Sequence, residues 1–273
     1  MKTLRKLPLH VVLVVVGAVI VVPLLYAVLS GFKSTDELSR NPFGLPEHWL
    51  TGNYTYFLGS GDFWRLLGNS TLVAVATTVI VVAVSALAAF SFARFAFRGR
   101  ELLFTFFTMG LMFPFAVAAL PLFLLLRYLG LLDNPLGVIL PQAAFGLPMT
   151  IIILRGFFRQ IPGELEEAAT LDGCSAMGFF WRVLLPMARP ALGTVSVLAV
   201  VASWNNFMLP LLVFTDSKWW TLPLGVGQLQ GQYSAEYARI FAYLVLAMVP
   251  ALALYSVAER QLVGGLTAGA TKG

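Results

Sequence analysis

The stretch LPLHVVLVVVGAVIVVPLLYAVLSGF, residues Leu7–Phe32, runs for 26 positions without an Asp, Glu, Lys or Arg. An α-helix of about 20 apolar residues crosses the hydrocarbon core of a bilayer, which is about 30 Å thick. A single segment in lipid can satisfy its own backbone hydrogen bonds only as a helix. The stretch therefore predicts a membrane-spanning helix, and the fold depends on how often such stretches recur.

Five further charge-free stretches follow, and they lie at Leu66–Ala93, Leu102–Leu126, Asn134–Leu154, Pro190–Thr215 and Ile240–Ala258. The chain of 273 residues is 59% hydrophobic and only 11% charged, whereas soluble domains are about 25% charged. Stretches this long do not fit barrel strands, which have about ten residues of alternating polarity. The sequence thus predicts an all-α integral membrane protein.

We predict six transmembrane helices in one domain covering residues 1–273. The predicted spans lie at about 9–31, 66–92, 103–126, 136–156, 191–214 and 239–258, with a loop at about 158–189 and a C-terminal tail at 259–273. A seventh charge-free run, Trp219–Ala235, contains three glutamines and three glycines, and is predicted to be a loop.

The distribution of Lys and Arg predicts the orientation. Six spans place both termini on one side, and twelve of the 18 Lys and Arg residues fall on that side. Cytoplasmic loops carry the excess of positive charge. Both termini and the loop at 158–189 are therefore predicted to be cytoplasmic. The net charge of +5 follows from this topology, and nothing else in the sequence favours a nucleic-acid partner.

Residues that could carry chemistry are scarce. Charged residues are absent from the interior of the predicted spans, and such charges mark ion coupling and proton relays. The sequence has no G-x-x-x-x-G-K-[ST] phosphate loop, and neither His10 nor His48 has metal-ligand spacing around it. We expect a chain that is not an enzyme and that holds no cofactor and no metal.

A few amides do lie within the spans. Asn205 and Asn206 fall in the fifth span and Gln142 in the fourth. At a rise of about 1.5 Å per residue, Asn205 lies about 22 Å from Pro190, past the midplane toward the outside. Such amides can hydrogen-bond between helices or form a polar wall of a solute path, and position alone favours the first alternative.

The loop at 158–189 begins as an acidic helix. Pro162 suits the first helical turn, where a missing N–H is no loss. Glu164, Glu166 and Glu167 then lie near the positive end of the helix dipole. Basic rather than acidic residues are attracted to the inner leaflet. Glu164 and Glu167, on one face beside alanines, therefore favour a docking helix for a cytoplasmic partner over a helix lying on the membrane.

A second short helix is predicted in the same loop. Gly173 can adopt the left-handed conformation that ends the first helix, and Ser175 is a suitable N-cap for the second. Phe179, Phe180 and Val183 share one face of that second helix, which suits attachment to the membrane-embedded core. The loop thus reads as a helix, a glycine turn and a helix, and it is too short to be a domain.

The residues of this loop resemble a known family. Glu167-Ala168-Ala169, three residues, Gly173, nine residues, Val183, one residue and Leu185-Pro186 resembles the EAA loop of ABC importer permeases, in which isoleucine is usual at the position of Val183. Further segments resemble the carbohydrate-importer branch that includes the smaller membrane subunit of the maltose transporter. They are Ser91–Arg100, Leu154–Gly173, Ser203–Phe207 and Gly265–Gly273, so the likeness covers nearly the whole chain.

The resemblance implies a type I ABC importer permease in a bacterial or archaeal cytoplasmic membrane. It implies a second homologous permease subunit, two ATPase subunits that bind ATP and Mg, and an extracytoplasmic binding protein that delivers a sugar. It implies ATPase coupling at Glu164, Glu167, Ala168, Ala169, Asp172, Gly173 and Pro186, and an ATPase-interface tail with Gly265, Thr267, Gly269 and Lys272. It also makes Gln142, Asn205 and Asn206 candidates for the substrate path.

Two departures from the family pattern bear on these roles. Cys174 stands where alanine is frequent, and a small thiol fits there. Asn206 stands where an acidic residue is frequent, which leaves hydrogen bonding to hydroxyls as its role. The sequence predicts a permease subunit of an ATP-driven carbohydrate importer. The alternatives are the same machinery for a non-sugar solute, such as a phosphorylated polyol, and a self-contained secondary carrier.

Overall fold

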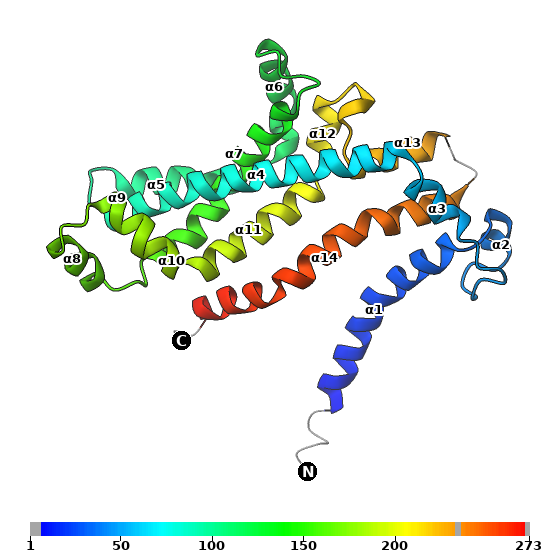
Figure 1. Cartoon of the computed structure of the whole chain (residues 1–273), viewed down its shortest axis with the longest axis horizontal. Coiled ribbons are helices and arrows are strands. Elements are labelled where there is room, and N and C mark those ends of the chain that lie inside the picture. The colour runs from blue at the N-terminus through cyan, green and yellow to red at the C-terminus, as the bar shows by residue number, and fades with distance from the viewer. Residues whose placement is uncertain (1–6, 233–235, 271–273) are drawn as a thin grey trace. The chain divides into compact units, whose positions relative to one another are not determined.

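The computed structural model describes residues 7–232 and 236–270, and every regular element in these ranges is a helix (Figure 1). The chain divides into two compact units. One holds the chain up to Leu67 together with Leu224–Pro250, and the other holds Gly68–Pro223 together with the chain from Ala251 onward. Three helices contribute residues to both units, and these are α4 (Gly61–Arg94), α13 (Leu222–Gln232) and α14 (Tyr237–Ala270).

The first unit is built around an aromatic cluster. It contains α1 (Leu7–Gly31), α2 (Thr35–Arg40) and α3 (Gly52–Leu58). The ring of Tyr243 on α14 is buried, and its centroid lies 5.3 Å from that of Phe57 and 6.0 Å from that of Phe63, both in edge-to-face geometry. Asn53 fastens α3 to the end of α1, because its Nδ2 donates at 2.9 Å to the carbonyls of Gly31 and Lys33.

The second unit has its hydrophobic core where four helical segments meet. These are α4, α7 (Pro135–Phe158), α11 (Arg189–Trp204) and the segment formed by α9 (Ala176–Phe179), the π-helical turn η3 (Phe180–Leu184) and α10 (Leu185–Met187). Small residues on α4, Ala86 and Ala89, allow close approach, and the rings of Phe90 and Phe180 lie 5.0 Å apart. Leu154 and Leu184 are fully buried in this core.

The third predicted span is not one continuous helix. It consists of α5 (Arg100–Met109), the 3-10 turn η2 (Gly110–Met112) and α6 (Phe115–Tyr128), bent by 100°. Phe113 precedes a proline and takes an extended conformation, with φ −83° and ψ 111°, as steric contact with a following proline ring requires. Pro114 then serves as the N-cap position of α6. The prediction of a single helix at 103–126 is therefore wrong at this break.

The fifth predicted span, at 191–214, is also interrupted. α11 ends at Trp204, and a short helix, α12 (Met208–Val213), follows after three residues, Asn205, Asn206 and Phe207. η4 (Ser217–Trp219) completes this connection. At the other end of α11, the segment Ala176–Met187 meets it at 78°.

The run predicted to be a loop, Trp219–Ala235, is largely helical, because α13 covers Leu222–Gln232. Its glycines and glutamines favoured a loop, but two other features decide the outcome. Pro223 lies in the first turn, where proline is well accommodated. Leu222 and Leu229 are seven residues apart, so they share one helix face, and both are buried.

Three described helices are long and apolar enough to cross a membrane as single segments. They are His10–Gly31, Gly61–Arg94 and Pro135–Phe158, and the number rises to five if each of two bent pairs forms one span. The pairs are Arg100–Met112 with Phe115–Tyr128, and Ala176–Met187 with Arg189–Trp204. Tyr237–Ala253 is a shorter apolar segment within α14, which continues as one helix to Ala270.

The core of the second unit yields a stability prediction. Phe180→Ala should lower the free energy of unfolding by about 3–5 kcal/mol, because it leaves a cavity in a packed site; the Phe180 side chain is 1% exposed. The neighbouring Trp181→Ala is the matched control, since Trp181 is 60% exposed. The control should shift the apparent Tm in detergent much less. Equal shifts for the two variants would contradict the assignment of this core.

Candidate functional site

The predicted docking helix is α8 (Glu164–Leu171). The prediction of its end is confirmed, because Gly173 has φ +78° and closes the helix. The amide of Gly173 donates to the carbonyl of Thr170 at 3.0 Å, and that of Cys174 donates to the carbonyl of Ala169 at 2.8 Å. This pair of hydrogen bonds is the Schellman motif. Pro162 differs from the prediction, since it precedes the N-cap residue Gly163.

The side chains of α8 divide into an outer and an inner face. Glu164, Glu167 and Ala168 are exposed, as is Asp172 at the C-cap. Ala169 is half-buried and packs against the hydrophobic core of the second unit. Sequence reasoning missed Leu171, which is 89% exposed.

The segment after the turn joins α8 to the membrane-embedded core. Ser175 caps α9 as predicted, with its Oγ accepting from the amide of Gly178 at 3.1 Å. Phe179 and Phe180 are buried in the core, as their shared face predicted. Pro186 lies in the first turn of α10, directly after the π-helical turn. Because proline has no N–H, it cannot continue the hydrogen bonding of the preceding helix.

Arg94, the last residue of α4, holds the start of this loop. Its Nη2 donates to the carbonyls of Phe158 at 2.9 Å and Ile161 at 2.8 Å, just where α7 ends. Its Nη1 lies 3.7 Å from Oε2 of Glu166 on α8. The Arg94 side chain is only 9% exposed, and its guanidinium donates to two carbonyls where α7 ends. That of Phe158 also accepts from the amide of Ile161 at 3.4 Å.

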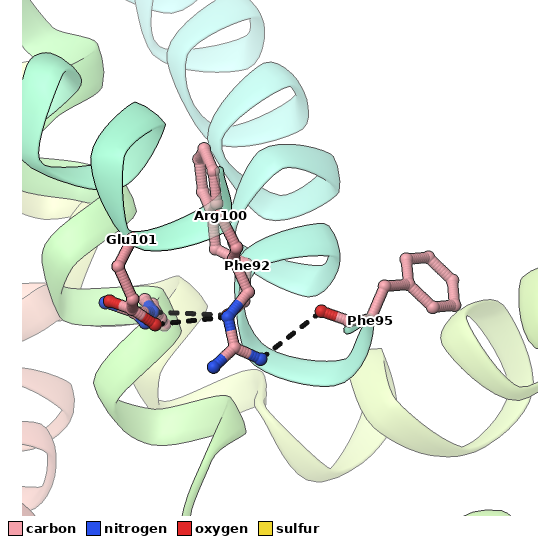
Figure 2. Close-up of polar contacts among 5 residues, drawn as sticks. Phe92, Phe95, Arg100 and Glu101 are labelled. Atoms are coloured by element: carbon pink, nitrogen blue, oxygen red, sulfur yellow. Dashed lines mark hydrogen bonds and ion pairs between the residues drawn. The ribbon is translucent and has the colours of Figure 1, made fainter. Parts of the chain in front are cut away.

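Arg155 connects α7 to the end of α4 and to α5. Its Nε donates to the carbonyl of Phe92 on α4 at 3.3 Å, and its Nη2 donates to Oε1 of Glu101 on α5 at 2.5 Å. Its guanidinium carbon lies 3.7 Å from the centroid of the Phe104 ring. Figure 2 shows Arg100 between the carbonyl of Phe95 and the carboxylate of Glu101. Two guanidiniums therefore share one carboxylate.

A cavity of about 520 Å³ lies within the second unit. It is lined by residues of α4, α7, α11 and the break between η2 and α6, and the lining residues as described carry no charged side chain. Its polar lining side chains are Thr77, Gln142, Thr150, Ser203 and Asn206, and its aromatic ones are Phe113, Phe115 and Phe145.

Gln142 is the centre of the polar lining. Its Oε1 accepts from Ser203 Oγ at 2.5 Å and from Thr77 Oγ1 at 3.4 Å. Its Nε2 is buried and has no hydrogen-bond partner in the described structure. An amide that is 8% exposed and lacks a partner for its donor group carries a desolvation cost. A ligand with an oxygen acceptor in the cavity would remove that cost.

The structure separates the two asparagines predicted for the substrate path. Asn206 lines the cavity, and its Oδ1 accepts from the amide of Leu209 at 3.1 Å. Asn205 is exposed, does not line the cavity, and donates from Nδ2 to the carbonyl of Val201 at 3.0 Å. Gln142 and Asn206 are thus brought together, and Asn205 is not.

The residues predicted for the ATPase-interface tail fall at the end of the chain. Gly265, Thr267 and Gly269 lie on the last turns of α14, which ends at Ala270. Lys272 lies outside the described residues. Among the described residues, no group of three or more His, Cys, Asp or Glu side chains could hold a metal ion.

Residues 81–262 match the family described as binding-protein-dependent transport system inner membrane component. A diacetylchitobiose uptake system permease protein of Streptomyces coelicolor is 36% identical over 262 residues, which cover 95% of this chain and 87% of the relative. An arabinooligosaccharides transport system permease protein of Halalkalibacterium halodurans is 33% identical, with 94% and 93% covered.

Two solved structures share the fold. One is a bacterial ABC transporter involved in the import of the acidic polysaccharide alginate, with a TM-score of 0.82, 23% identity, and 95% of this chain and 96% of that chain covered. The other is a bacterial alginate ABC transporter in complex with an alginate pentasaccharide-bound periplasmic protein, with a TM-score of 0.71, 15% identity, and 94% of each chain covered. The predicted all-α fold of an ABC importer permease is confirmed.

The Glu101 carboxylate yields a pH prediction. The hydrogen bond from Arg155, aided by both guanidinium charges, holds the pKa of Glu101 below its ordinary value of 4.5. A lowered folded-state pKa stabilises the fold above the unfolded-state pKa, and the stabilisation is lost as pH falls through the folded-state pKa. The apparent Tm of the wild type should therefore exceed that of Glu101→Gln by a constant margin near neutral pH. The margin should shrink below about pH 4.5. A margin independent of pH would contradict the assignment.

Proposed function

The chain belongs to the family of binding-protein-dependent transport system inner membrane components, and we propose that its cargo is a neutral carbohydrate. It is the permease subunit of an ABC importer, and is therefore a transport subunit rather than an enzyme. The observation that carries the proposal is the pairing of an exposed acidic helix, α8, with an uncharged, partly aromatic cavity in the same compact unit.

The outer face of α8 supports a role in receiving an ATPase. Glu167 and Glu164 offer carboxylates to basic residues of a partner, and Leu171 offers an apolar side chain. Ala168 leaves room for close approach of another surface. The chain has no phosphate loop, so ATP and Mg would be bound by the partner. Glycine at position 173 keeps the turn behind α8 tight, because its φ of +78° is unfavourable for other residues.

Further partners follow from the family. A second homologous permease subunit would complete the path, two ATPase subunits would supply the energy, and a binding protein would deliver the solute from outside. A structural neighbour is described in complex with a solute-loaded periplasmic protein. The excess of Lys and Arg on the terminus side supports cytoplasmic termini, in which case α8 and the end of α14 would lie on the side of the ATPase.

The cavity supports a neutral, hydroxyl-bearing solute. Gln142, Ser203 and Thr77 form a hydrogen-bonded group that has an unused amide donor. Phe115 and Phe145 lie in edge-to-face contact at 5.8 Å beside it, and aromatic rings provide apolar faces for a sugar ring. The described lining has no cation to neutralise a phosphate or carboxylate, which disfavours a phosphorylated polyol. Two relatives are described as carriers of diacetylchitobiose and arabinooligosaccharides.

The docking role of α8 is tested by co-purification of the partner subunits and by measurement of uptake and ATP hydrolysis. The wild-type chain, solubilised from its native membrane, should co-purify with an ATPase and a second permease. Glu167→Lys should abolish uptake and solute-stimulated ATP hydrolysis, because it places a like charge against the basic residue of the partner. The variant should still insert into the membrane. Asp62→Asn, which removes an exposed ion pair with Arg65, is the control. Recovery of the wild type as a lone chain would overturn the proposal.

The cavity is tested at Gln142. Gln142→Leu keeps a similar volume but removes the amide, so uptake at subsaturating solute should fall about fivefold, since one lost hydrogen bond is worth about 1 kcal/mol. Ser91→Ala is the control, because the Ser91 hydroxyl donates within α4, to the carbonyl of Leu87, and Ser91 does not line the cavity. The measurement is initial uptake of labelled solute into cells with equal amounts of assembled transporter. An unchanged rate for Gln142→Leu would remove this cavity from the solute path.

A further inference from the structure

Two buried arginines tie the ends of α4 and α7 to each other in opposite directions. Arg94 extends from the last residue of α4 to carbonyls at the end of α7, those of Phe158 and Ile161. Arg155 extends from the last turn of α7 to the carbonyl of Phe92, near the end of α4. Each helix end is therefore held by a guanidinium of the other helix, so neither end can shift without breaking charged hydrogen bonds.

Each arginine also contacts a carboxylate on a third helix. Arg94 lies beside Glu166 on α8, and Arg155 is hydrogen-bonded to Glu101 on α5. The four side chains thus form a chain of contacts from α8, through the ends of α4 and α7, to α5. All four helices belong to the second unit in this region.

We propose that Arg94 and Arg155 are positioning residues that relay displacement of α8 to the helices around the cavity. The inference rests on the proposed function, in which an ATPase moves α8. The relay reaches the cavity by covalent continuity. α4 carries Thr77 and α7 carries Gln142, and α5 leads through η2 to Phe113 at the bend.

The geometry at Arg94 leaves room for this relay to tighten. The distance from Nη1 to the Glu166 carboxylate is 3.7 Å, whereas a charge-assisted hydrogen bond of this kind is about 2.7–2.9 Å long. The Nε of Arg94 is buried without a hydrogen-bond partner in the described structure. Nη1 therefore lies within ion-pair distance of Glu166 but beyond hydrogen-bond distance, and movement of α8 toward α4 would convert this ion pair into a hydrogen bond.

The relay is tested by the amount of solute imported per ATP hydrolysed in the assembled transporter, reconstituted with its binding protein. Glu166→Gln keeps the shape of the side chain and removes its charge, and should lower this ratio about fivefold to tenfold. The ATPase should still co-purify in normal amount. Glu166→Asp keeps the charge and should retain most of the coupling. Asp62→Asn again serves as the ion-pair control.

A double-mutant cycle separates a relay from two independent effects. Arg94→Gln should lower the ratio at least as much as Glu166→Gln, and the double variant should be no worse than Arg94→Gln alone. Multiplicative losses would overturn the relay. A wild-type ratio of imported solute to hydrolysed ATP in Glu166→Gln would also overturn the relay. Loss of assembly with this ratio unchanged would overturn it as well. A wild-type transporter without ATP-dependent uptake would instead refute the proposed function, so the two failures can be told apart.

Discussion

Every backbone amide and carbonyl at membrane depth needs a partner, because lipid offers none. This constraint makes the chain helical and decides where the helices can break. Two of the interruptions in the second unit, at Phe113–Pro114 and at Asn205–Phe207, contribute residues to the cavity lining. At the second break the asparagines satisfy the backbone themselves, since Asn205 donates to the carbonyl of Val201 and Asn206 accepts from the amide of Leu209. Residues at which these helices are interrupted therefore also line the cavity.

The same need for partners explains the arginines at the ends of α4 and α7. Helix ends leave carbonyls without intrahelical partners, and a guanidinium with five donors can satisfy several of them at once. Arg94 does so for the carbonyls of Phe158 and Ile161, and Arg155 donates to that of Phe92. Each retains a contact with a carboxylate, of Glu166 and Glu101 respectively. A lysine has three donors on a single nitrogen, so it could not span two carbonyls and a carboxylate with the same geometry.

What the sequence could predict was local. Gly173 and Ser175 were assigned correctly because a left-handed turn and an N-cap depend on residues within a few positions. The roles of Arg94 and Arg155 could not be predicted, because their partners lie more than 50 positions away. The sequence has a proline at 114, but the 100° bend joins two helices that pack on distant segments, α5 on α7 and α6 on α12. α13 was missed because burial of its leucines outweighs its glycine and glutamine content.

Under the proposed function, the placement of charge in the second unit separates the supply of energy from the choice of solute. The ion pairs of Arg94 with Glu166 and of Arg155 with Glu101 lie at the ends of α4 and α7, and the described cavity lining has no charged side chain. A charge in a poorly solvated cavity would hold an oppositely charged solute too tightly for release, since desolvation strengthens electrostatic attraction. Neutral hydrogen-bonding groups such as Gln142 and Ser203 bind hydroxyls weakly enough to let them go. A path that must release its cargo at every cycle is better served by amides and hydroxyls, while the lasting ionic contacts belong where helices must move together.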